Sequence, residues 1–78
     1  MTAANAVREL MKRRNVTQTE LAEKVGMKNQ SNVSEALKRD MKVSVFVRFV
    51  DALGYKLVIE GKVKGEYEDD VMVLTDGL

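Results

Sequence analysis

The segment that decides the fold is TQTELAEKVGMKNQSNVSEALKR, residues Thr17–Arg39, which predicts two short helices joined by a turn. Thr17 and Glu20 have the spacing of a capping box, in which each side chain accepts a hydrogen bond from the other residue's backbone N–H, so a helix is expected to begin here. Gly26 is expected to end this helix, because glycine adopts the left-handed conformation at low cost. Asn29 is a preferred N-cap residue and is expected to start the second helix.

Apolar side chains recur at helical spacing in both predicted helices, so each helix has one face that is expected to be buried. These inward-facing residues are Leu21, Ala22, Val25, Val33, Ala36 and Leu37. The outward face of the second helix carries short or forked hydrogen-bonding groups. A purely solvated face favours Glu, Lys and Ala instead, because those residues have good helix propensity.

Hydrogen-bonding side chains of this kind read base edges in the major groove of DNA. Asparagine or glutamine pairs with adenine, glutamate accepts from cytosine, and serine bonds to several bases. The predicted base-reading residues are Gln30, Ser31, Asn32, Ser34 and Glu35. The alternative is a polar surface helix whose first turn carries only its own capping residues.

Cations and amides flank the same face, and we predict that they contact DNA phosphates. The predicted phosphate-binding residues are Gln18, Lys28, Asn29, Lys38, Arg39 and Lys42. Gln18 lies at the start of the first helix, where amide groups and backbone N–H groups can meet a phosphate. The cations are expected to add an attraction that depends on salt and not on DNA sequence.

The segment resembles the helix-turn-helix of phage Cro and repressor proteins, from about Val7 to Gly54. The residues that carry the resemblance are Gln18, Leu21, Ala22, Val25, Gly26 and Val33. In such a motif the small Ala22 allows the two helices to pack closely, and Gly26 makes the turn. The stretch from Gly26 to Val33 is one residue longer than is usual in the family, so which of Lys28, Asn29 and Gln30 reach a base stays open.

The resemblance implies a mainly α fold, a compact helix-turn-helix domain of the four- to five-helix type with four helices expected. It also implies a repressor-like transcriptional regulator that binds a double-stranded DNA operator as a two-fold homodimer, with half-sites about one helical turn apart.

Composition argues against catalysis. The 78 residues allow one domain at most and contain neither cysteine nor histidine, which removes a disulfide framework, a thiolate zinc site and the commonest general base. The acidic run Glu68–Asp70 lacks the ligand spacing of a calcium loop. We therefore expect no enzymatic activity, no cofactor and no metal. The absence of cysteine fits a cytoplasmic protein, and no apolar run is long enough for a signal peptide or a membrane span.

Charge is unevenly distributed along the chain, although the net charge is only +1. Residues 1–59 hold eleven Lys and Arg against six Asp and Glu, whereas residues 60–78 hold two against six. A basic body with an acidic end indicates one surface that faces a polyanion and a separate segment that faces away from it.

Two further helices are predicted around the central segment. Residues 3–14 have apolar groups on one face and Thr2 as a possible N-cap. Residues 43–50 are rich enough in β-branched side chains for a strand, but the spacing of the apolar groups favours a helix over residues 45–53. That helix is expected to have Ser44 as its N-cap and Gly54 just beyond its end, with Phe46 and Phe49 in the core.

Beyond Gly54 the apolar pattern changes to alternation, so residues 55–59 and 71–74 predict a β-hairpin or a pair of strand arms. We accordingly divide the chain into a helix-turn-helix DNA-binding domain, residues 1–54, and a C-terminal β arm, residues 55–78. The arm is expected to belong to the same compact unit and to serve for dimerisation. The predicted dimer interface consists of Tyr55, Leu57, Val58 and Ile59.

Two interpretations of the arm stay open. Pairing with the same strand of a second chain would cover an exposed strand edge, whereas an intramolecular hairpin would cover the chain's own core. The second function considered is an antitoxin-like protein, in which the helix-turn-helix binds an operator and the arm captures a toxin-like partner.

Overall fold

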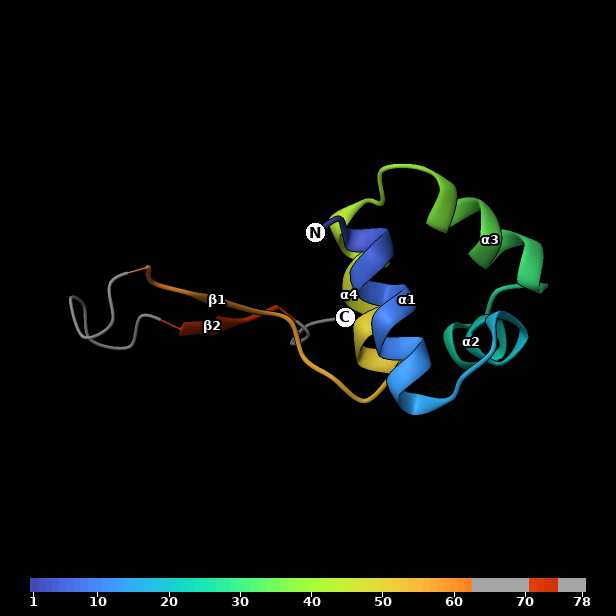
Figure 1. Cartoon of the computed structure of the whole chain (residues 1–78), viewed down its shortest axis with the longest axis horizontal. Helices are drawn as coiled ribbons and strands as arrows, with labels where there is room; N and C mark the ends of the chain where they lie inside the picture. Colours follow the sequence, from blue (N-terminus) through green and yellow to red (C-terminus); the bar gives the residue numbers. More distant parts are fainter. Residues whose placement is uncertain (63–70, 75–78) are drawn as a thin grey trace.

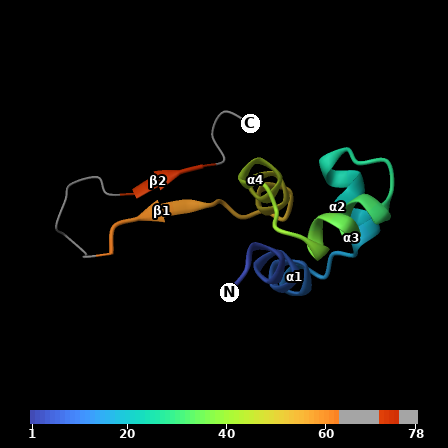
Figure 2. The ribbon, with the colours of Figure 1, turned by 90° about the horizontal axis from the view of Figure 1, so that it is seen from above.

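The computed structural model describes residues 1–62 and 71–74. Four helices form one unit, and a two-stranded antiparallel ribbon extends from it (Figures 1 and 2). The elements are α1 (Ala3–Arg14), α2 (Gln18–Val25), α3 (Gln30–Lys38), α4 (Val43–Ala52), β1 (Val58–Glu60) and β2 (Val71–Val73). The predicted mainly α fold with a small C-terminal β element is therefore confirmed.

The local capping signals act as the sequence predicts. Thr17 Oγ1 accepts from the backbone N–H of Glu20 and the Glu20 carboxylate accepts from the backbone N–H of Thr17, each at 3.1 Å, so the capping box of α2 is complete. Gly26 ends α2 with φ +76°, a left-handed conformation that suits glycine. Thr2 and Asn29 cap α1 and α3 through their side chains.

The core lies between the four helices. Phe49 of α4 is completely buried, as are Val7 of α1, Leu21 of α2 and Val33 of α3, so each helix contributes at least one inaccessible side chain. Phe46 and Ala36 are half-buried and pack against this cluster. An interior of this kind is close-packed, so even a one-methylene change in side-chain volume perturbs the structure. Such packing fixes the relative positions of the helices.

Two details of the prediction around α4 are wrong. The helix begins at Val43, two residues before the predicted start, and its N-cap is Lys42, which makes no side-chain capping bond. Ser44 lies inside the first turn and is not the cap. The strand alternative for residues 43–50 is also excluded, because this stretch is helical and buries Val47 and Val50.

The arm also begins later than the alternation predicts. Tyr55 is not in a strand: it is half-buried and packs against the helical core. Its ring also lies under the Arg14 guanidinium, whose central carbon is 4.5 Å from the ring centroid. Gly54, with φ +84°, turns the chain from α4 toward the ribbon.

The ribbon is formed within one chain. In its register Val58 pairs with Val73, Ile59 with Met72, and Glu60 with Val71. The ribbon projects from the helical unit on the side away from α3 (Figures 1 and 2). Several of its apolar side chains are therefore exposed and do not cover the core of their own chain.

Candidate nucleic-acid interface

Helix α3 lies at the surface of the helical unit and packs on α2 and α1 (Figure 1). Val33 and Leu37 anchor its inner side, with exposures of 0% and 3%. The polar residues of its outer side are thereby turned to solvent along a single helix face, because positions three and four apart share a face. This geometry can present a row of hydrogen-bonding groups to an elongated partner.

The predicted base-reading residues do not all occupy equivalent places. Gln30, Ser31, Asn32 and Glu35 are exposed on α3. Ser34 is half-buried and lies at the margin of the packed side. The structure therefore brings four of the five predicted groups onto accessible surface, with Ser34 the least available of the set.

Asn29 caps the start of α3. Its Oδ1 accepts from the backbone N–H of Ser31 at 3.0 Å and from the Ser31 hydroxyl. The Asn29 carbonyl also accepts from the backbone N–H of Asn32 at 3.2 Å. The capping prediction for Asn29 is confirmed, and the capping bonds engage the amide oxygen of this side chain rather than its amide nitrogen.

Glu35 forms ion pairs with the two cations at the C-terminal end of α3. Its carboxylate is 3.2 Å from Arg39 Nη2 and 3.9 Å from Lys38 Nζ, and all three side chains are largely exposed. Exposed pairs of this type contribute only about 0–1 kcal/mol, so these side chains can exchange one partner for another at small cost. The pairing also offsets the negative charge of Glu35 on a surface that is otherwise polar and basic.

Arg8 of α1 contacts the same C-terminal end of α3. Its Nη2 donates to the backbone carbonyl of Leu37 at 3.0 Å, and its Nη1 donates to Asn5 Oδ1 at 3.3 Å. A cation at a helix C-terminus is favourable, because the final carbonyls carry partial negative charge. Arg8 is thus committed to the scaffold and fixes the end of α3.

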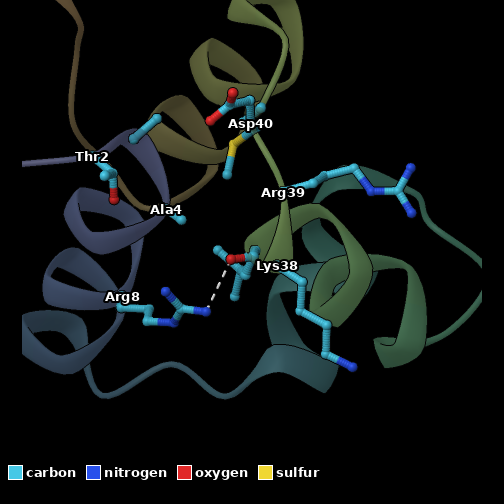
Figure 3. Close-up of a pocket in the computed structure, with 9 residues that line it drawn as sticks. Thr2, Ala4, Arg8, Lys38, Arg39 and Asp40 are labelled. Carbon is cyan, nitrogen blue, oxygen red and sulfur yellow. Dashed lines mark hydrogen bonds between the residues drawn. The ribbon is translucent and has the colours of Figure 1, made fainter.

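Figure 3 shows this contact inside an open groove of about 550 Å³ between the start of α1 and the end of α3. Arg8 points to the α3 terminus, whereas Lys38 and Arg39 point away from Arg8. The cations around this groove diverge, so the groove does not concentrate positive charge on one point.

Arg48 of α4 gives α2 a similar support. Its Nη2 donates to the backbone carbonyl of Val25, the last residue of α2, at 2.7 Å. Both helices of the motif therefore have a C-terminal carbonyl bonded to an arginine from a scaffold helix. Sequence reasoning missed these two arginines, because their partners lie 29 and 23 positions away in the chain.

The remaining predicted phosphate-binding residues lie outside α3. Gln18 is the first residue of α2 and is half-buried, and Lys28 is exposed in the turn before α3. Lys42 is the N-cap of α4, whose first turn contains no acidic residue. A lysine at the positive end of a helix dipole increases the local positive potential, and helix N-termini of this kind favour anions.

The predicted dimer residues are distributed along the root and the first strand of the ribbon. Tyr55 packs on its own core and Leu57 is half-buried, whereas Val58 and Ile59 are 39% and 48% exposed. The acidic residues Glu66–Asp70 lie outside the described residues. The structure thus places only Val58 and Ile59 of the predicted interface on freely accessible surface.

Two further features of the described ranges concern metal ions and the membrane. Residues 1–62 and 71–74 contain no group of three or more acidic, histidine or cysteine side chains arranged to hold a metal ion. In the same ranges every helix is too short or too polar to cross a bilayer. No protein-family model, curated protein or solved structure matches the chain.

Proposed function

We propose that this chain is a non-enzymatic cytoplasmic regulator that binds double-stranded DNA sequence-specifically, with α3 in the major groove. The observation that carries the proposal is the outward face of α3, where Ser31, Asn32 and Glu35 are exposed opposite the buried Val33 and Leu37. These groups have the donors and acceptors that distinguish base pairs in the major groove. A groove about 12 Å wide accepts a helix, so α3 can approach with this face forward.

The charge around α3 supports a polyanionic ligand. Lys28 precedes the helix, Lys38 and Arg39 lie at its end, and Lys42 begins the next helix. Cations at both ends of a base-reading helix can contact phosphates on either side of the groove, which fixes its register. Arg8 and Arg48 are excluded from this group because they bond the C-termini of α3 and α2.

A homodimer completes the proposed mode of action. One recognition helix covers few base pairs, and two-fold dimers increase discrimination by reading two half-sites spaced by one helical turn or a multiple. The ribbon provides the contact surface, because it exposes apolar side chains and lies away from α3. A dimer binds an inverted repeat more tightly than a single half-site, because its second contact with the DNA is intramolecular.

The second candidate is an antitoxin-like protein whose ribbon captures a different protein. The exposed apolar side chains of the ribbon favour this reading as well, because such patches mark interaction sites. The two candidates share the DNA-binding role of α3 and differ in the occupant of the ribbon. The oligomeric state of the isolated chain separates them, since only the first requires self-association.

Selection from a library of randomised DNA duplexes tests the proposal. The purified full chain is expected to enrich an inverted repeat, and the variant Leu37→Asp, which disrupts the packing of α3, is expected to enrich none. A full chain that is folded but enriches no sequence at about physiological salt, where specific complexes bind about 10³–10⁷ times more tightly than non-specific ones, would refute the proposal.

A further inference from the structure

The register of the ribbon determines which side chains share a face. Opposed residues in an antiparallel pair point to the same side, and successive residues alternate. Ile59 is opposite Met72, and the backbone N–H of Leu74 donates to the carbonyl of Leu57 at 2.7 Å, which continues the same register by one pair. One face, here called the Ile59 face, therefore consists of Leu57, Ile59, Met72 and Leu74. The opposite face, the Val58 face, consists of Val58, Glu60, Val71 and Val73.

The two faces differ in charge. The Ile59 face carries four apolar side chains and no charged one, and Ile59 and Met72 at its centre are 48% and 60% exposed. The Val58 face contains the Glu60 carboxylate directly opposite Val71. Burying a carboxylate without a partner is costly, so the Ile59 face is the better candidate for a dry contact.

A two-stranded ribbon with both faces in water is marginal at best, and a hydrophobic face needs a covering layer. The chain's own helices do not supply it, because the ribbon projects away from them (Figures 1 and 2). Of the six large apolar side chains that are most exposed within residues 1–62 and 71–74, four lie on the ribbon. The apolar surface that requires a partner is therefore concentrated there.

We infer that the Ile59 face is the self-association surface of the protein, and that it stacks on the Ile59 face of a second copy about a two-fold axis. The inference deepens the proposed homodimer and rests on that proposal for its biological role. A two-fold axis brings the same patch of each copy together, so the patch must be complementary to itself. An uncharged face of four apolar residues meets this requirement without any like-charge contact.

Face-to-face stacking also buries more of the ribbon's exposed apolar surface than edge-to-edge pairing does. Edge-to-edge pairing would satisfy backbone groups, but water can hydrate those groups at an exposed edge. It would leave Ile59 and Met72 in solvent on the sheet surface. Stacked sheets pack about 10 Å apart and bury their facing side chains, so face-to-face association removes the larger exposed apolar area.

Single-cysteine variants of the full chain test this arrangement, because the protein contains no other cysteine. Ile59→Cys and Met72→Cys place the thiol on the Ile59 face, and the matched controls Val58→Cys and Val71→Cys place it on the other face of the same strands. After treatment with a short bismaleimide, we expect covalent dimers from the first pair and monomers from the controls. Cross-linking that is equal on the two faces, or stronger from the controls, would overturn the inference.

Sedimentation of variants with a lysine introduced on one face tests the inferred dimer interface independently. Ile59→Lys is expected to shift the protein from dimer to monomer with an unchanged helical circular dichroism spectrum, whereas Val58→Lys is expected to remain dimeric. A wild-type chain that is monomeric at micromolar concentration would overturn the inference. A different protein would then be the candidate partner of the ribbon. Both experiments omit DNA, so a chain that dimerises through this face but selects no duplex would retain the inference and refute the proposed function.

Discussion

The Arg48 guanidinium donates a 2.7 Å hydrogen bond to the backbone carbonyl of Val25, the last residue of α2, across 23 positions of sequence. The contact connects the end of the first motif helix to α4, which also contributes Phe49 to the core. Arg8 makes the corresponding bond to Leu37 in α3. The C-terminal ends of α2 and α3 are thus each bonded to an arginine from a scaffold helix.

Arg48→Ala is expected to lower the free energy of unfolding by about 1.5 kcal/mol, the low end of the range for hydrogen bonds to charged groups. The Val25 carbonyl loses a charged donor, and the Arg48 stem loses its packing. Urea denaturation followed by circular dichroism measures the change. The matched control is Arg13→Ala, which breaks an exposed pair with Glu9 and is expected to cost less than about 0.5 kcal/mol. Equal losses for the two variants would contradict a bracing role for Arg48.

The contact between Arg14 and Tyr55 is expected to stabilise the root of the ribbon. The 4.5 Å separation from the ring centroid suits a cation–π interaction of about 0.5–1 kcal/mol at an exposed site. A double-mutant cycle with Arg14→Ala and Tyr55→Leu should return a coupling energy of that size, since leucine retains apolar bulk without an aromatic face. Tyr55→Phe should preserve the coupling. A cycle that pairs Arg13→Ala with Tyr55→Leu serves as the control and should show no coupling.

The capping box predicts an acid-dependent loss of stability. The backbone N–H of Thr17 donates to the Glu20 carboxylate and holds its pKa below the ordinary value of 4.5, with further lowering from the Thr17 side chain and the charge of Lys24. Because the folded-state pKa is lowered, the stabilisation is complete above about 4.5 and disappears as the pH falls through the lowered pKa. The wild type should therefore exceed Glu20→Gln in free energy of unfolding at neutral pH, by a margin that narrows below about pH 4.5. A margin that does not change with pH would show that the charge of Glu20 contributes nothing.

Lys42 is predicted to contact phosphate rather than a base. Lys42→Ala should weaken binding to selected and random duplexes by the same factor, and should reduce the slope of log affinity against log salt by about 0.9. The control Lys56→Ala removes an exposed lysine at the root of the ribbon and should leave the slope unchanged. A change in sequence preference with an unchanged slope for Lys42→Ala would assign the residue to base recognition instead.

Local signals in the sequence predicted much of the fold. The capping residues make only local contacts, so their roles in starting or ending a helix follow from spacing and conformational preference. They are Thr17 with Glu20, Gly26 and Asn29. The apolar periodicity likewise located the buried side of α3. Consequently the composition of the candidate DNA-reading face was predictable before the fold was known.

Contacts between distant residues were not predictable in this way. Arg8 and Leu37 are 29 positions apart, and nothing in their local sequence indicates that they meet. Ser44 has the chemistry of an N-cap, yet the helix begins earlier, at Val43, because propensity is a weak prior that tertiary context overrides. Tyr55 fits the strand alternation but packs on the core, which moves the ribbon's start to Val58.

The most direct test of base recognition by α3 is the affinity of Asn32→Ala for a panel of selected duplexes in which each base pair is replaced in turn. Asn32 is exposed on the outward face of α3 and is not its cap. We expect the variant to lose about 1–3 kcal/mol on the selected duplex and to lose its preference at one base pair of each half-site, with the remaining preferences retained. If Asn32→Ala and Gln30→Ala both keep the affinity and the preference of the wild type at every position, α3 does not read DNA sequence through this face.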